Sequence, residues 1–145
     1  MAFSVYSLAD TYTTINNPDV GKMVLSDCGA GRITWSYAGE MSNNTTSATG
    51  YTVINRLVSK SGQISIEVPV NSDADLFLRK WIAYLKAKST PTKRYGLTSL
   101  IVKDSATGRT NSFSGVVPQK EPDENYDAVA GNRQYNLLFA ELVQA

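Results

Sequence analysis

The stretch SDADLFLRKWIAYLKAK, residues 72–88, predicts one α-helix in a chain whose other segments mostly alternate between apolar and polar residues. Apolar side chains recur along it at the spacing that gathers them on one helical face. The members of this expected core stripe are Leu78, Trp81, Ile82 and Leu85. We interpret the stripe as the face that packs on a sheet, and the alternative interpretation is a partner-binding face.

Both ends of this helix carry residues that helix termini favour. Ser72 is a good N-cap, because its hydroxyl accepts a hydrogen bond from a free backbone N–H of the first turn. Asp73 and Asp75 place negative charge at the positive end of the helix dipole, and Lys86 places positive charge at the other end. Pro91 then prevents the helix from continuing.

Short segments with the period of a β-strand lie on both sides of the helix. The expected strands are residues 11–15, 20–25, 32–37, 51–58, 63–70, 97–103, 112–117 and 133–143. Residues 104–110, DSATGRT, have the composition of a hairpin turn. The sequence therefore predicts a single mainly β domain, residues 1–145, in which an antiparallel barrel or sandwich of about eight strands carries helix 72–88 on its side.

Three segments fall outside this pattern. Residues 1–9 are expected to form a short extended arm, and residues 118–132 a connection that is rich in acidic residues and broken by proline. Residues 38–50, AGEMSNNTTSATG, are polar and are expected to form a loop that is longer than most hairpin connections. Long loops within compact domains are often functional, so we expect a partner to order this one. The alternative is a mobile surface loop.

The composition argues against an enzyme, a cofactor and a metal site. The chain has no histidine and one cysteine, Cys28, so a zinc site and an intramolecular disulfide are not expected. No serine or cysteine nucleophile would have its usual base. The carboxylates near Glu121 lie together in one loop, which does not set them opposite each other across a cleft. No signal peptide or membrane span is recognised.

Charge is distributed unevenly, although the net charge is only +1. Residues 79–94 include bases and no acid, namely Arg79, Lys80, Lys86, Lys88, Lys93 and Arg94. Residues 121–127 include acids and no base, namely Glu121, Asp123, Glu124 and Asp127. Each is either a solvated surface or one of two complementary patches between neighbouring copies. Aromatic residues within the basic run also leave open a small single-stranded nucleic-acid-binding module, although a nearly neutral domain argues against it.

Two long motifs carry a resemblance to a known family. They are KSGQISIEVPVNSDADLFLRKW at residues 60–81 and SLIVKDSATGRTNSFSGVVPQKEPDENY at residues 99–126, followed by a final strand that bears tyrosine. In their order and spacing, over residues 10–143, the chain resembles the tail tube proteins of contractile-tailed bacteriophages. Those proteins share a fold with the tube protein of type VI secretion.

The resemblance implies a structural protein of the virion, made in the cytoplasm of the host bacterium. Homohexameric rings would stack into a tube that conducts DNA into the host, with sheath, baseplate and tail terminator proteins as partners. The expected contacts between subunits or rings come from the arm and the long loop: Phe3, Tyr6, Glu40, Met41, Asn43, Asn44, Thr45 and Thr46. The expected contacts with the sheath or a neighbour are Glu121, Asp123, Glu124, Asp127, Arg79 and Lys80.

A lumen through which DNA slides should be polar and non-adhesive. Two pairs of alternate strand positions fit this requirement, Thr34 with Ser36 and Ser65 with Glu67. The sequence leaves open which of the two expected sheet faces would line the channel.

Overall fold

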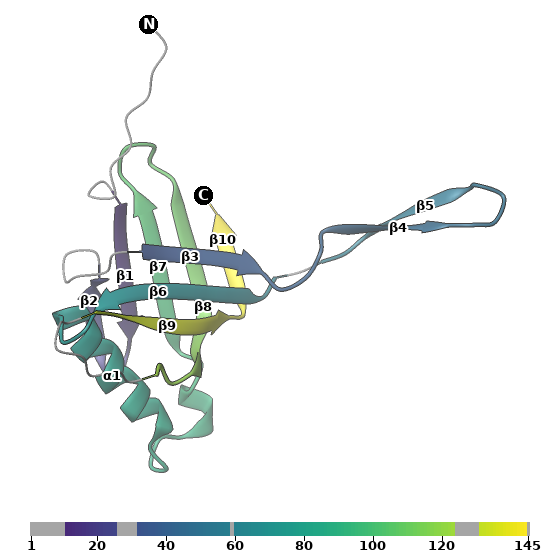
Figure 1. Cartoon of the computed structure of the whole chain (residues 1–145). Coiled ribbons are helices and arrows are strands. Elements are labelled where there is room, and N and C mark those ends of the chain that lie inside the picture. The colour runs from purple at the N-terminus through teal and green to yellow at the C-terminus, as the bar shows by residue number, and fades with distance from the viewer. Residues whose placement is uncertain (1–10, 26–31, 59, 124–130, 145) are drawn as a thin grey trace, which may run out of the picture.

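The computed structural model describes residues 11–25, 32–58, 60–123 and 131–144 (Figure 1). The expected arm at residues 1–9, with Phe3 and Tyr6, lies outside these residues, as do Cys28, Glu124 and Asp127. The described chain forms a folded body and a two-stranded hairpin that extends away from it.

The body is built on an eight-stranded antiparallel sheet, bent so that its two halves face each other (Figure 1). Its strands are β1 (Thr11–Asn17), β2 (Gly21–Val24), β3 (Arg32–Tyr37), β6 (Gly62–Pro69), β7 (Thr98–Asp104), β8 (Thr110–Lys120), β9 (Asn132–Phe139) and β10 (Glu141–Gln144). They pair in the order β2-β1-β7-β8-β9-β6-β3, and β10 pairs with β8. The predicted mainly β, antiparallel fold with one helix is confirmed, although the sheet does not close into a barrel.

Strand β8 carries the bend, because its two ends belong to different halves of the sheet. Residues 110–116 pair with β7, and the segment after them pairs with β9. Gly115 has φ +65° at this corner, and a Cβ there would lie 2.7 Å from Cβ of Ala140. The prediction of one continuous strand at residues 133–143 was wrong, because the chain changes direction at this same corner. It is interrupted at Ala140, whose backbone N–H donates to Ser114 O at 3.0 Å, and the chain then turns onto β8 as β10.

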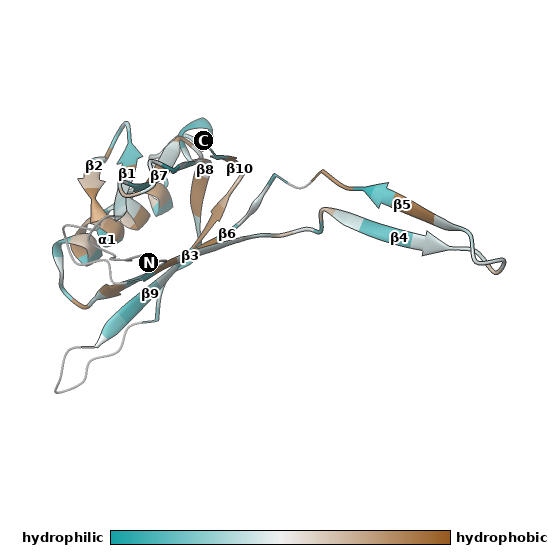
Figure 2. Ribbon diagram, turned by 90° about the horizontal axis from the view of Figure 1, so that it is seen from above, coloured by the Kyte–Doolittle hydropathy of each residue, from teal (hydrophilic) through white to brown (hydrophobic). Residues whose placement is uncertain are grey.

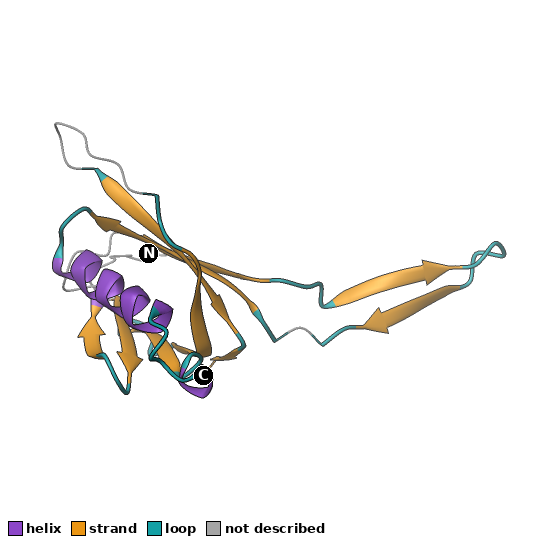
Figure 3. Ribbon diagram, turned by 90° about the horizontal axis from the view of Figure 1, so that it is seen from below, coloured by secondary structure: helices purple, strands orange, loops and turns teal. Residues whose placement is uncertain are grey.

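Helix α1 (Asp73–Lys86) lies across one side of the body (Figure 3). Ser72 is its N-cap, and Ser72 Oγ accepts from Asp75 N at 3.3 Å. The four expected stripe residues are buried, together with Ala74. They join Leu25, which follows β2, and strand residues from both halves of the sheet in one core: Ile15, Ile64, Ile66, Val68, Leu100, Val102, Phe113, Val116, Tyr135, Leu137 and Phe139.

One buried polar cluster ties the helix to two strands. Thr98 Oγ1, on β7, accepts hydrogen bonds from Trp81 Nε1 and from Asn17 Nδ2, each at 2.8 Å. Because all three residues are buried, these bonds satisfy polar groups that would otherwise be unpaired in the core. Trp81 therefore anchors the helix and is not available to stack on a ligand.

The expected irregular loop at residues 38–50 was wrong for its middle part. Residues Ser42–Thr46 form strand β4, which pairs with β5 (Thr52–Arg56) in a separate two-stranded sheet. The expected strand at residues 51–58 therefore does not join the body sheet. Polar Asn and Thr side chains gave no apolar alternation from which β4 could be predicted. Figure 3 shows the hairpin extending beyond β3 and β6, the two strands that it connects.

Candidate functional site: assembly surfaces

The hairpin has one face on which apolar side chains surround a small amide cluster. Asn43 lies opposite Asn55 and Thr45 opposite Val53, so these four side chains share a face. Asn55 Nδ2 donates to Asn43 Oδ1 at 2.8 Å and to Thr45 Oγ1 at 3.1 Å. The same alternation adds further apolar members, and we call the set Met41, Tyr51, Val53 and Leu57 the hairpin apolar face.

None of the residues that the structure describes covers this face. Between residues 38 and 58, every residue is exposed except the half-buried Asn55. Met41 is 82% exposed, Tyr51 is 72% exposed, and Ile54 on the opposite face is 75% exposed. A two-stranded hairpin is marginally stable in water by itself, and exposed apolar patches mark protein–protein contacts. The hairpin is therefore a candidate surface for contact with another molecule.

The structure brings six expected contact residues together on this arm and adjacent to it. Glu40, Met41, Asn43, Asn44, Thr45 and Thr46 are all exposed there. The sequence analysis missed the apolar residues contributed by β5 and its flanks, among them Tyr51, Val53 and Leu57. Their spacing at every second position was visible in the sequence, but it was interpreted as a strand of the body sheet.

A second surface is the solvent-facing side of β3, β6 and β9, which we call the polar face. Both pairs of expected lumen residues lie on it, since Thr34 pairs with Ser65 and Ser36 with Gln63. Ser65 in turn pairs with Asn136 on β9. The two alternatives that the sequence left open are therefore neighbours on one face.

Side chains on the polar face hydrogen-bond to one another. Gln134 Nε2 donates to Ser65 Oγ at 2.7 Å, and Asn132 Nδ2 donates to Glu67 Oε1 at 3.2 Å. Arg32 lies directly opposite Glu67 in the strand register, so the two formal charges on neighbouring strands balance. The result is a wall of amides and hydroxyls with little net charge.

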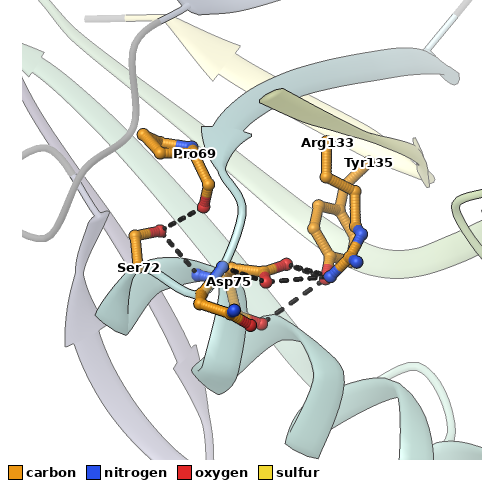
Figure 4. Close-up of polar contacts among 6 residues, drawn as sticks. Pro69, Ser72, Asp75, Arg133 and Tyr135 are labelled. Atoms are coloured by element: carbon orange, nitrogen blue, oxygen red, sulfur yellow. Dashed lines mark hydrogen bonds and ion pairs between the residues drawn. The ribbon is translucent and has the colours of Figure 1, made fainter. Parts of the chain in front are cut away.

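A buried ion pair links strand β9 to helix α1, on the side of the strand opposite the polar face (Figure 4). Arg133 Nη1 donates to both carboxylate oxygens of Asp75 at 2.8 and 2.9 Å, and Tyr135 OH donates to Asp75 Oδ1 at 2.6 Å. Asp75 and Tyr135 are fully buried and Arg133 nearly so. Because Arg133 and Tyr135 alternate with Gln134, this network fixes the strand that presents the polar face.

The network sets the charge of Asp75. Burial by itself would raise the pKa of this carboxyl, but hydrogen bonds from Tyr135, the Asn71 backbone and Arg133, with the charge of Arg133, lower it below 3.8. Burial and the neighbouring carboxylate raise the pKa of Tyr135, which stays a hydrogen-bond donor. Asp75 was expected only to complement the helix dipole. Its ion pair joins residues far apart in the chain, which helix periodicity does not reveal.

The expected basic and acidic stretches meet partly within the chain. Lys86 Nζ lies 2.6 Å from Glu121 Oε1, and Lys120 Nζ lies 4.0 Å from Asp123 Oδ1. All four side chains are more than half exposed, so these pairs contribute little to stability. Of the other expected contact residues, Lys80 is exposed and Arg79 is half-buried beside the groove between α1 and the end of β8.

Three further findings concern the aromatic residues, the potential metal ligands and the helices of the described ranges. Trp81 is buried, and Tyr84 OH donates to Asp19 Oδ2 at 2.7 Å, so both aromatics of residues 79–94 are engaged inside the chain, while Tyr95, directly after them, is exposed. No cluster of three potential metal ligands occurs among the residues the structure places. Within the same residues, no helix has the length and hydropathy needed to cross a bilayer.

Solved structures with a similar fold come from contractile injection systems and from a GTA particle tail. A chain in the sheath–tube complex of the PVC extracellular contractile injection system is 12% identical, with a TM-score of 0.62, and 93% of this chain covers 87% of that one. A chain in the tail of an empty GTA particle, computed with C6 symmetry, is 12% identical with a TM-score of 0.62, covering 97% of this chain and 98% of that one. Comparison with curated proteins finds no match.

The sequence itself matches a family along almost its whole length. The family described as bacteriophage PhiTE tail tube protein matches residues 3–144, which include the hairpin, both halves of the sheet and the helix. The chain therefore belongs to the family of bacteriophage PhiTE tail tube proteins, and it is a structural tube component of a phage or phage-like tail.

Proposed function

We propose that this chain assembles into homohexameric rings, and that the rings stack into the tail tube through the hairpin apolar face. The observation that carries the proposal is the exposure of Met41, Tyr51 and Val53 on an arm that no part of the described body covers. Burial of such a face against another copy stabilises the contact by about 25 cal/mol for each Å² of apolar surface removed from water. Sixfold symmetry is supported by analogy with the GTA tail, which was computed with C6 symmetry.

The polar face is the surface that suits the lumen. It presents Thr34, Ser65 and Asn136 in one row across three strands, and its balanced charges give a sliding polyanion neither strong attraction nor strong repulsion. Its side chains also partly satisfy one another, as Gln134 and Ser65 do, so they need no bond to cargo. We propose that DNA passes along this face into the host without sequence-specific binding.

The remaining contacts would be made with neighbours and with other tail proteins. Arg79 and Lys80 on α1, and the acidic residues from Glu121 to Asp127, are proposed to contact the next subunit of the ring; Lys86 Nζ of α1 lies beside Glu121 Oε1. Sheath, baseplate and tail terminator proteins are proposed partners. The solved relatives that support this are a sheath–tube complex, a sheath/tube terminator and a baseplate.

Assembly of hairpin variants tests the proposal. We expect the Val53→Ser/Leu57→Ser chain to stay folded, because both side chains are exposed, and to form no stacked tubes under conditions in which the natural chain does. Negative-stain microscopy detects the tubes, and circular dichroism checks the fold.

Leu76→Ser is the matched control, because Leu76 is an exposed apolar residue on the helix, away from the hairpin. Normal tubes are expected from this variant. Normal tubes from the hairpin variant would contradict the role assigned to the hairpin, and strictly monomeric behaviour of the natural chain would contradict the assembly as a whole.

A further inference from the structure

The body has a second exposed sheet face, and its chemistry differs from that of the polar face. We infer that the solvent-facing side of β1, β2, β7, β8 and β10 is the docking surface for the tail sheath, and that the sheath supplies an aliphatic segment with acidic side chains beside it. This inference rests on the proposed function, because it takes the polar face as the lumen. We call the surface the outer face.

The outer face and the polar face point away from each other. Side chains from both halves of the sheet meet between them, as when Trp35 of β3 contacts Phe113 of β8 with ring centroids 5.3 Å apart. The two halves and the helix are seen from above in Figure 2. If the polar face lines the channel, the outer face must look away from the tube axis, where a sheath surrounds the tube.

One cross-strand row of the outer face holds three aliphatic side chains, which alternate with a threonine and a serine. The strand register places Thr14 opposite Ile101, Ile101 opposite Ser112, and Ser112 opposite Val143. Ile101 is 41% exposed and Val143 is 56% exposed. Val24 of β2 continues the row beyond Thr14. The three aliphatic residues therefore lie on alternate strands of one row, and exposed apolar surface of this kind is where protein contacts form.

Lysines flank this row on both sides. Lys103 lies opposite Tyr12, one step of the alternation away from Ile101. Lys22 lies opposite Asn16, on the other side of the row. Both lysines are exposed, and among the described residues of the outer face the one acid is Glu141, on the far strand β10. A partner with carboxylates beside its aliphatic residues would complement this pattern.

The sheath is the occupant that fits this surface best. The polar face has one outward aliphatic residue, the half-buried Leu138. Exposed aliphatic residues therefore distinguish the outer face from the polar face. A tube-type chain of the same fold is found in a sheath–tube complex. A second copy of this chain is the rival occupant, and the experiment below separates the two.

The test uses assembled tubes and the sheath protein of the same particle. We expect tubes of the Ile101→Ser/Val143→Thr chain to form normally and to bind sheath protein about tenfold more weakly in co-sedimentation. Wild-type sheath affinity would overturn the inference. Loss of tubes in a folded variant would also overturn it, because it would place a second copy on the outer face.

Charge reversal provides an independent readout that spares the β-sheet core. For Lys22→Glu/Lys103→Glu we expect intact tubes, weakened sheath binding and a reduced dependence of that binding on salt. Leu76→Ser, outside the outer face, should bind sheath normally. Unchanged affinity and salt dependence would overturn the acidic character assigned to the sheath segment. Failure of the natural chain to form tubes would instead refute the proposed function.

Discussion

The body and the hairpin of this chain differ in how much of their side-chain surface is buried. In the body, strands and helix bury Trp81, Phe113 and Tyr135 completely or almost so, and the helix is tied to β9 by an ion pair. In the hairpin, two strands pair correctly while nearly every side chain stays in water. The body therefore has the contacts required to fold alone, whereas the hairpin has the surface required to join another molecule.

This difference separates the residues that stabilise the subunit from the exposed residues that are available for contacts with another molecule. Burial of apolar area provides most of the free energy of folding, and a hairpin without a core has almost none of it. Val53 and Leu57 are exposed and contribute little to the stability of the isolated subunit, which is consistent with the proposed role in the assembled tube. The following predictions test this division between the two regions, from the largest expected change in the free energy of unfolding to the smallest.

Trp81→Ala should cause the largest loss of subunit stability. It removes a fully buried side chain and the hydrogen bond to Thr98, so we expect the free energy of unfolding to fall by about 3–5 kcal/mol. Urea unfolding of dispersed subunits, followed by circular dichroism, measures the change. The control Leu76→Ala, at an exposed helix position, should stay within about 0.5 kcal/mol of the natural chain. A loss below 1 kcal/mol for Trp81→Ala would contradict the assigned core.

Asp75→Asn should be nearly as severe, because it leaves the charge of Arg133 buried and unpaired. We expect a loss of about 3 kcal/mol at neutral pH. The folded-state pKa of Asp75 lies below 3.8, so its contribution is complete above that pH and is lost as the pH falls through the lower, folded-state value.

The difference between the natural chain and Asp75→Asn should therefore be constant above about pH 5 and narrow below pH 3.8. Urea unfolding at several acidic pH values measures this. A difference that stayed constant down to about pH 2 would show that the Asp75 carboxylate does not lose its stabilising contribution there.

Gly62→Ala should produce an intermediate effect at the junction of body and hairpin. A Cβ at this position would lie 2.1 Å from the backbone oxygen of Ser36 and 2.7 Å from Cζ of Phe139. We expect a loss of about 1–3 kcal/mol in the free energy of unfolding from overpacking. Gly96→Ala is the matched control, since nothing lies within 4 Å of its added methyl. Equal stabilities of the two variants would show that β3 and β6 can separate freely at this point.

Ile54→Ser in the hairpin should have the smallest effect on the subunit. Ile54 is 75% exposed, so we expect a change within about 0.5 kcal/mol in the free energy of unfolding. The measurement is the same urea titration of dispersed subunits. A loss above 1 kcal/mol would mean that the hairpin packs on the body in solution and would remove the contrast between the two regions.

The helix and most strands could be predicted from sequence because their signals are local. Ser72 and the apolar stripe marked helix α1, and strict alternation marked β6 from Gln63 onward. Strand β4 could not be found in this way, since Asn44 and Thr45 have no apolar alternation and their pairing depends on β5. The break at Ala140 was also hidden, because it arises from close contact with Gly115 on another strand.

The candidate surfaces show the same limit. The sequence placed inter-subunit contacts near residues 38–50 and named polar lumen residues, but it could not place Thr34 and Ser65 on one face, because strand order is not encoded locally. It marked Asp75 as a helix-terminal acid and missed its ion pair with Arg133. Long-range pairing decides which exposed residues share a surface.

By itself, the sequence determined a mainly β chain with one capped, amphipathic helix and a family resemblance to tail tube proteins. Periodicity and capping are properties of neighbouring residues, so they can be read along the chain. The tertiary structure alone decided that residues 38–58 form an arm and that the polar face spans three strands. It also decided that the strand positions aligned with Ile101 lie on the outer face. These features depend on which strands lie side by side, and only packing around a common core sets that order.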